Sequence, residues 1–193
     1  VDNDRVDLTN LQRQILHSGD TVGWPKVASG AQTLRRLNSD IEVWPHQENV
    51  NAVNVERLIE SYDIIVDGTD NFDVRRIVST ACFKSKKAYI YGSVYQFEGQ
   101  VGVFGHSDSV NRACFNCFQP QKPSDEASPN CSEAGVLGVL PGIIGCMQAL
   151  EALKIILGIS GDSDSRIFHF DGETFEMSSF LVQRRQSCVI CSS

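Results

Sequence analysis

Four of the seven cysteines form two Cys-x-x-Cys pairs, Cys114 with Cys117 and Cys188 with Cys191. Four thiolates suit a closed tetrahedral zinc site, with Zn–S distances of about 2.3 Å. A redox pair or two disulfides would use the same residue types, but two such pairs in a chain without a secretory signal favour a metal. Because four protein ligands leave no open coordination position, we predict a structural zinc that ties the middle of the chain to its C-terminal end.

Two acidic side chains, Asp67 and Asp70, follow the short apolar run at Asp63–Val66. Ligands of open α/β sheets lie beyond the carboxyl ends of the strands, and Mg²⁺ is held by one or two carboxylates together with phosphates. Asp70, with Asn71 beside it, is therefore a candidate magnesium or nucleotide ligand. The alternative is that Asp70 or Asn71 only caps a helix that begins near Phe72.

Polar groups of the kind that bind a nucleotide lie near the N-terminus. Asp2 follows a predicted strand end, where an acid of a doubly wound fold can accept hydrogen bonds from ribose hydroxyls. Asn10, Arg13 and Lys26 supply an amide, a guanidinium and an ammonium, and the two cations can offset phosphate charge. Taken alone, each of these segments is better explained as a solvated turn or a polar helix face.

The remaining cysteines are of two kinds. Cys131 lies in a polar loop, where it is either a reachable thiolate nucleophile or an ordinary loop cysteine, and the residues alone favour neither. Cys82 and Cys146 lie among apolar neighbours in predicted helices, so we expect both in the core.

The elements that position these groups alternate between strand and helix. Helical spacing of apolar residues predicts helices over residues 9–16, 25–37, 53–61, 72–85 and 141–157. Short apolar or alternating runs predict strands ending at residue 2 and over residues 41–45, 63–66, 88–94, 100–104, 166–170 and 174–181. The run at 63–66 is typical of a central parallel strand that is buried on both faces. This order predicts an α/β fold with a mostly parallel sheet flanked by helices and an antiparallel portion, in one domain over residues 1–193.

Composition excludes some classes of partner. The chain has 193 residues, a net charge of −7 and a pI near 5.0, which argues against sequence-independent binding to nucleic acid or to an anionic membrane. No early apolar run is present, so we expect no signal peptide. The cysteine pattern favours a reducing, cytoplasmic compartment.

Taken together, these residues resemble the MoeB/ThiF family, relatives of the ubiquitin-activating enzymes. The likeness covers essentially the whole chain, and the ordered combination of segments is far more specific than any one of them. The matching residues are Val1-Asp2, Asp4, Thr9-Asn10-Leu11-Gln12-Arg13-Gln14, Gly23, Pro25-Lys26, Thr69-Asp70-Asn71, Glu98-Gly99-Gln100, Cys114, Cys117, Cys131, Glu133-Ala134-Gly135-Val136, Gln148-Ala149, Glu151, Cys188 and Cys191.

The resemblance implies a Rossmann-like fold and a chemistry. Such enzymes use Mg-ATP to adenylate the C-terminal glycine of a ubiquitin-like sulfur carrier similar to MoaD, ThiS or the ubiquitin-related modifier, with release of pyrophosphate. They serve sulfur transfer in cofactor or tRNA-thiolation pathways and commonly form homodimers. By this analogy Asp70 would hold Mg²⁺ or orient the nucleotide, and Cys131 would match a position that binds the activated tail covalently in some members. The implied nucleotide-binding residues are Asp2 at the ribose, Asn10, Arg13 and Lys26 at the phosphates, and Thr9, Leu11, Gln12 and Asn71 beside them.

One family feature is missing from the sequence. The glycine-rich phosphate loop that lies upstream of the ribose acid in this family has no counterpart. We expect the chain to be a fragment of a longer protein, and the alternative is a degenerate member of the family. The alternative function is a non-catalytic, zinc-stabilised module that docks a ubiquitin-like protein. A nucleotide-dependent oxidoreductase is a third class, but the chain has no dinucleotide fingerprint.

Overall fold

The structure is a computed structural model that describes residues 1–105, 113–122, 135–160 and 165–192. The chain divides into two compact units, Val1–Asn51 and Ala52–Ser193, and each is described by itself. The prediction of a single domain stays a prediction. Among the described residues, no helix is long and apolar enough to cross a membrane.

The first unit contains one full helix, α1 (Lys26–Leu37), and two 3-10 turns, η1 (Leu8–Asn10) and η2 (Gly19–Thr21). Pro25 precedes α1, as proline's fixed φ favours at the start of a helix. The predicted helix over 9–16 is wrong, because side-chain hydrogen bonds at both ends of η1 close a single turn. Residues 1–2 and 41–45 form no strand in this described unit.

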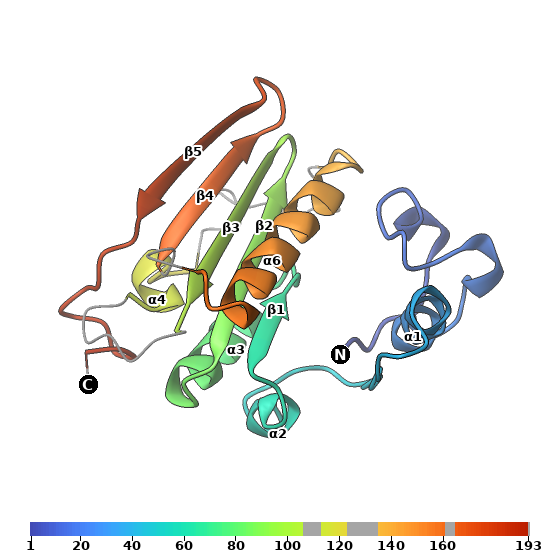
Figure 1. Ribbon diagram of the computed structural model, residues 1–193, viewed down its shortest axis with the longest axis horizontal. Coiled ribbons are helices and arrows are strands. Elements are labelled where there is room, and N and C mark those ends of the chain that lie inside the picture. Colours follow the sequence, from blue (N-terminus) through green and yellow to red (C-terminus); the bar gives the residue numbers. More distant parts are fainter. Residues whose placement is uncertain (106–112, 123–134, 161–164, 193) are drawn as a thin grey trace. The chain divides into compact units, whose positions relative to one another are not determined.

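A mixed sheet forms the second unit (Figure 1). Its strands lie in chain order, β1 (Ile64–Asp67), β2 (Ala88–Tyr95), β3 (Glu98–Phe104), β4 (Arg166–Asp171) and β5 (Glu176–Leu181). β1 pairs with β2 in parallel, and the other three pairs are antiparallel. The α/β class with parallel and antiparallel portions is confirmed. The central position expected for 63–66 is wrong, because β1 lies at an edge of this sheet and Val66 is 52% exposed.

Helices cover the sheet on both faces. α6 (Leu140–Ile156) packs against β1, β2 and β3 and runs across the front of the sheet in Figure 1. α3 (Phe72–Lys84) packs against β2 and α4 (Phe115–Phe118), and α2 (Val55–Ile59) packs on α3. The predicted helices at 25–37, 72–85 and 141–157 and the predicted strands of the sheet are confirmed within one or two residues at most ends.

Strand alternation gives the sheet two different faces. On the α6 face lies a mainly aliphatic core whose buried members are Ile90, Val101, Val103, Leu140, Ile144 and Phe170. On the other face, the fully buried ring of Phe115 lies 5.7 Å from Tyr89, 5.2 Å from Tyr91 and 5.8 Å from Phe104 between ring centroids. Since Phe115 belongs to the first Cys-x-x-Cys pair, this aromatic cluster anchors that pair to the sheet.

Candidate functional site

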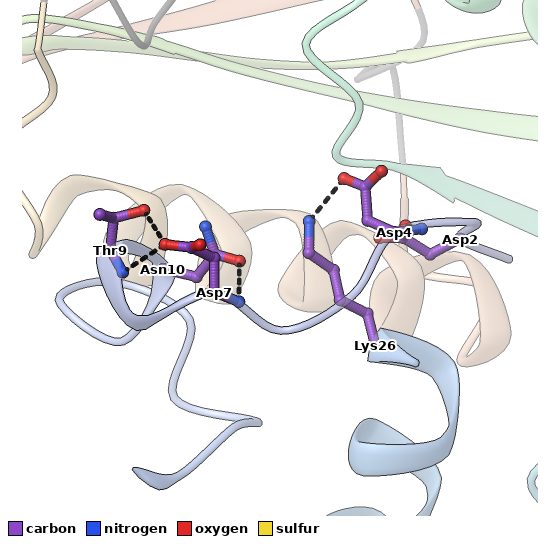
Figure 2. A network of polar contacts seen from close by, with 6 residues as sticks. All are labelled: Asp2, Asp4, Asp7, Thr9, Asn10 and Lys26. Carbon is purple, nitrogen blue, oxygen red and sulfur yellow. Dashed lines mark hydrogen bonds and ion pairs between the residues drawn. The ribbon is translucent and has the colours of Figure 1, made fainter. Parts of the chain in front are cut away.

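In the first unit, Lys26 is held by Asp4. The Nζ of Lys26 lies 2.8 Å from Oδ2 of Asp4, and the backbone N–H of Lys26 donates to the carbonyl of Asp4 at 2.9 Å (Figure 2). The lysine side chain is only 14% exposed, whereas that of Asp4 is 71% exposed. The ammonium therefore has a defined position next to a carboxylate that solvent can reach.

Asp2 stabilises the same segment through two hydrogen bonds. Its Oδ1 accepts the backbone N–H of Asp4 at 2.8 Å, and its own backbone N–H donates to the carbonyl of His46 at 3.1 Å. Asp2 therefore orients the segment that carries Asp4. The sequence singled out Asp2 as the ribose acid, and the ion pair of Asp4 with Lys26 was not predicted, because the two residues are 22 positions apart.

Asp7, Thr9 and Asn10 form a closed hydrogen-bond box around η1 (Figure 2). Oδ1 of Asp7 accepts from Oγ1 of Thr9 at 2.6 Å and from its backbone N–H at 2.8 Å, while Oδ1 of Asn10 accepts the N–H of Asp7 at 3.1 Å. The side-chain hydrogen bond from Thr9, followed by its backbone hydrogen bond, lowers the pKa of Asp7. In this structure the Asn10 amide is thus positioned by local bonds.

The rest of the predicted nucleotide segment extends from this box. Nη1 of Arg13 donates to the carbonyl of Thr9 at 3.4 Å, a long bond that uses one of the five guanidinium donors. Leu11 and Arg13 are half-buried and Gln12 is exposed. The structure thus brings Thr9, Asn10 and Arg13 together around one turn.

In the second unit, Asp67 and Asp70 have different environments. Asp67 is 4% exposed, and its carboxylate accepts the hydroxyl of Tyr89 at 2.6 Å and the backbone N–H of Thr69 at 2.7 Å. Asp70 is exposed. Asn71 caps α3, since its Oδ1 accepts the N–H groups of Asp73 and Val74. The cap is therefore Asn71, and Asp70 is the acid with access to a ligand.

The four cysteines of the two pairs converge, as expected. Their sulfur atoms all lie within 4.8 Å of one another, with 3.5 Å between Cys114 and Cys188, 3.3 Å between Cys117 and Cys191, and 4.0 Å between Cys114 and Cys117. A tetrahedral ion with bonds of about 2.3 Å separates its ligand sulfurs by about 3.8 Å. The four sulfurs are therefore close enough to hold a metal, and their donor set fits zinc.

The pKa values of these thiols agree with a metal site. Burial raises the pKa of Cys114 well above its ordinary value, and burial also raises that of Cys117. Burial opposes ionisation of Cys188 too, but backbone N–H groups of Cys191 and Ile190 lower its pKa to about 7. Buried thiols that resist ionisation become thiolates when a cation is bound among them.

The other cysteines complete the comparison with the sequence. Cys82 is fully buried, as expected, and burial raises its pKa to about 12. The expectation for Cys146 is wrong, because its position on α6 faces outward and the residue is exposed. Cys131 lies outside the described residues.

Three residues that sequence reasoning did not place in the site surround the loop after β1. Tyr89, Arg75 and Gln148 bond to Asp67, Thr69 and the neighbouring strand. Of these three residues, only Gln148 was singled out in the sequence, because it belongs to a segment that resembles the family. Arg75 and Tyr89 look like ordinary helix and strand residues until the fold brings them together.

The profile of the ThiF family matches residues 1–190. The chain belongs to the ThiF family. The resemblance found in the sequence is thereby confirmed, and the match covers the predicted nucleotide segment, the acidic loop and three members of the cysteine cluster.

Curated relatives of this ThiF-family chain extend the comparison. The adenylyltransferase and sulfurtransferase MOCS3 of Culex quinquefasciatus is 42% identical over 193 residues, which are 100% of this chain and 43% of the relative. A sulfur carrier protein adenylyltransferase of Thermus thermophilus is 35% identical over 193 residues, which are 99% of this chain and 71% of the relative. The chain therefore spans less than half the length of the first of these relatives.

Solved structures share the fold. MccB of Escherichia coli in a complex with MccA-N7isoASN superposes with a TM-score of 0.82 at 20% identity, over 100% of this chain and 58% of that one. MccB with ATP superposes with a TM-score of 0.80 at 21% identity, again over 100% and 58%. The architecture of the ThiF-family chain is thus also that of these enzymes.

Proposed function

We propose that this chain is the adenylating part of an enzyme that activates the C-terminal glycine of a ubiquitin-like sulfur carrier with ATP. Its membership in the ThiF family carries the proposal, since the match runs from residue 1 to residue 190. The names of the relatives from Culex and Thermus, both adenylyltransferases, support it. The polar groups around η1 in the first unit, and Asp70 in the second, are of the types that such a reaction needs.

In the first unit the proposed roles follow from charge and access. Within the described residues, Arg13 makes one long hydrogen bond that uses a single guanidinium donor. Lys26 is a nearly buried ammonium whose position Asp4 fixes. Both cations suit phosphate oxygens, and preorganised charge of this kind contributes most when negative charge develops in the transition state. Asp2 is the proposed ribose acceptor. The same segment contains Thr9, Asn10, Leu11 and Gln12, which are proposed to lie beside the nucleotide.

In the second unit, Asp70 is the proposed magnesium ligand or nucleotide-orienting group, with Asn71 beside it. Asp67 is committed to Tyr89 and Thr69, so of these two acids Asp70 is the one whose exposed carboxylate a hard cation can reach. Cys114, Cys117, Cys188 and Cys191 would hold zinc, which supplies a structural cross-link and no open ligand position.

The proposed reaction is an in-line transfer. A carboxylate oxygen of the carrier's terminal glycine bonds to the α-phosphorus of ATP, and the bond from that phosphorus to the pyrophosphate oxygen breaks. The products are an acyl-adenylate and pyrophosphate. Cys131 is the candidate to accept the activated tail as a thioester, with AMP as the leaving group. Sulfur transfer in a cofactor or tRNA-thiolation pathway would follow.

Two further properties belong to this proposal. A homodimer is proposed on the family resemblance, and sedimentation analysis that gives a monomer mass at micromolar concentration would contradict it. A cytoplasmic location is proposed because four closely spaced thiols stay reduced, or bind metal, in a reducing compartment.

ATP–pyrophosphate exchange tests the proposed function. The protein at its full natural length is assayed with a panel of purified ubiquitin-like carriers that end in Gly-Gly, and one carrier is expected to stimulate exchange. Arg13→Ala should reduce the stimulated rate about 100- to 1,000-fold, as expected for loss of a preorganised charge. Arg36→Ala is the matched control, since Arg36 lies in the last turn of α1 and is exposed.

Either result is informative. Exchange with one carrier establishes the activity and identifies the carrier. A folded, zinc-loaded protein that exchanges with no carrier supports the non-catalytic docking module instead.

A further inference from the structure

The loop after β1 continues beyond the end of its strand pairing. β1 pairs with β2 as far as Asp67, which lies opposite Tyr91. The loop then runs through Thr69 and Asp70 to the helix cap at Asn71. Backbone groups beyond the last paired residue have no strand to bond to, and an exposed loop of this kind is usually mobile. The position of the Asp70 carboxylate thus depends on what holds this loop.

Arg75 takes the place of the missing strand partner. Its Nε donates to the carbonyl of Thr69 at 2.9 Å, and its Nη2 donates to the same carbonyl and to that of Gly92 at 3.0 Å. Gly92 is the residue of β2 directly after the last one that pairs with β1. The guanidinium thus bridges the loop and the strand where backbone pairing stops.

The guanidinium is itself fixed. Its Cζ lies 5.0 Å from the centroid of the Tyr91 ring, which is buried under the aromatic cluster. This cation–π contact suits a guanidinium and helps to hold it in place. A lysine at this position could not serve both carbonyls from one rigid, planar group.

From the opposite face of the sheet, Gln148 of α6 holds the start of the same loop. Its Nε2 donates to the carbonyls of Asp67 at 2.8 Å and Ile90 at 3.1 Å, and the residue is 5% exposed. Tyr89 adds the hydroxyl bond to the Asp67 carboxylate. Three elements, β2, α3 and α6, therefore converge on a loop of a few residues.

We propose that Arg75 is a positioning residue for Asp70, because it pins the Thr69 carbonyl to β2 and so fixes where the next residue presents its carboxylate. This inference rests on the proposed function, in which Asp70 meets the nucleotide or its magnesium. Gln148 and Tyr89 bond to Asp67 at the strand end, whereas Arg75 bonds to the carbonyl of Thr69 beyond it, the residue whose amide donates to Asp67.

The test compares Arg75→Lys with Arg76→Lys in the protein at its full natural length. Arg76 is the next residue of α3, but its Nε bonds to Asn116 at 3.2 Å, away from the loop. Two readouts are used: kcat and KM of ATP–pyrophosphate exchange, and hydrogen exchange of the Thr69 amide, which donates to Asp67. The double variant Arg75→Lys/Asp70→Asn completes a cycle with the two single variants.

Arg75→Lys is expected to lower kcat about 10- to 100-fold, as for a misplaced reactive group, with KM for the carrier nearly unchanged. The Thr69 amide should exchange at least about 10-fold faster, and the double variant should be no slower than Asp70→Asn alone. Arg76→Lys should change neither readout.

Other outcomes overturn the inference. If the losses of Arg75→Lys and Asp70→Asn multiply in the double variant, Arg75 acts independently of Asp70. If Thr69 exchange is unchanged, Arg75 does not hold the loop. If the wild-type protein shows no pyrophosphate exchange, the proposed function fails and the link to Asp70 catalysis fails with it, whereas the amide readout still decides whether Arg75 fixes the loop.

Discussion

Asp67 and Asp70 are three positions apart in the sequence and are in very different surroundings. The carboxylate of Asp67 is buried and bonded to Tyr89 and Thr69, whereas Asp70 is exposed. Substitution of Asp70 should therefore reduce activity without loss of stability, whereas substitution of Asp67 should reduce stability. Asp70→Asn is expected to reduce pyrophosphate exchange about 100-fold or more with an unchanged melting temperature.

Asp67→Asn is the partner variant in that comparison. It removes the charge from two buried hydrogen bonds and should lower the free energy of unfolding by about 1–3 kcal/mol. Thermal unfolding and exchange kinetics of both variants check the assignment. A large stability loss in Asp70→Asn would show that Asp70 is a structural residue.

Asp7 predicts a pH dependence of stability in the η1 turn. Its pKa is lowered by the hydrogen bonds from Thr9, so the folded state holds the proton less tightly than the unfolded chain, whose value is about 3.9. The stabilisation is present above pH 4 and is lost as the pH falls through the lowered value. The free energy of unfolding of wild type relative to Asp7→Asn should thus decrease toward low pH, and chemical denaturation from pH 7 to pH 3 measures it. A difference that grows at low pH would contradict the assignment.

At the scale of elements, the contact between α6 and β2 depends on the absence of a side chain at Gly92. A Cβ at Gly92 would overlap with the Gln148 amide. Gly92→Ala should therefore displace Gln148 from the carbonyls of Asp67 and Ile90, which leaves buried acceptors unpaired and destabilises the protein by about 1–3 kcal/mol. Gly145→Ala, in the middle of α6 with open space around it, should be neutral or stabilising by up to about 1 kcal/mol.

Thermal unfolding of the two glycine variants separates these effects. Equal melting temperatures for Gly92→Ala and wild type would mean that Gln148 finds another conformation at no cost. The loop between β1 and α3 would then depend on α6 less than the structure indicates.

At the scale of the whole molecule, the cysteine cluster joins segments 74 positions apart in the sequence. Cys114→Ser should lower zinc content and stability together, by about 3 kcal/mol, which corresponds to about 10 °C in a chain of this size. Elemental analysis and calorimetry measure the two quantities. Cys146→Ser is the control, because Cys146 is exposed and outside the cluster.

Complete loss of zinc with an unchanged melting temperature would contradict a structural role for the metal. Zinc binding should also weaken as the pH falls, because the ligands bind as thiolates and burial already raises the pKa values of Cys114 and Cys117.

The sequence alone determined the features that depend on neighbouring residues. The helices at α1, α3 and α6 follow from the spacing of apolar side chains. A cap at Asp70 or Asn71 follows from the preference of such side chains for that position, and the structure shows that Asn71 is the cap. The convergence of the four cysteines was also predictable, since two Cys-x-x-Cys pairs have few other uses in a chain of this kind. Family membership followed from many short segments in a fixed order.

Only the tertiary structure decided which side chains meet. Spacing could not show that Asp67 is buried and Asp70 accessible, that Lys26 pairs with Asp4, or that Arg75 bridges Thr69 and Gly92. It also misplaced the strand at 63–66, because an apolar run indicates burial but does not say how many neighbours a strand has. These outcomes depend on burial and on contacts between distant segments, which form only when the sheet and its helices have closed around the loop.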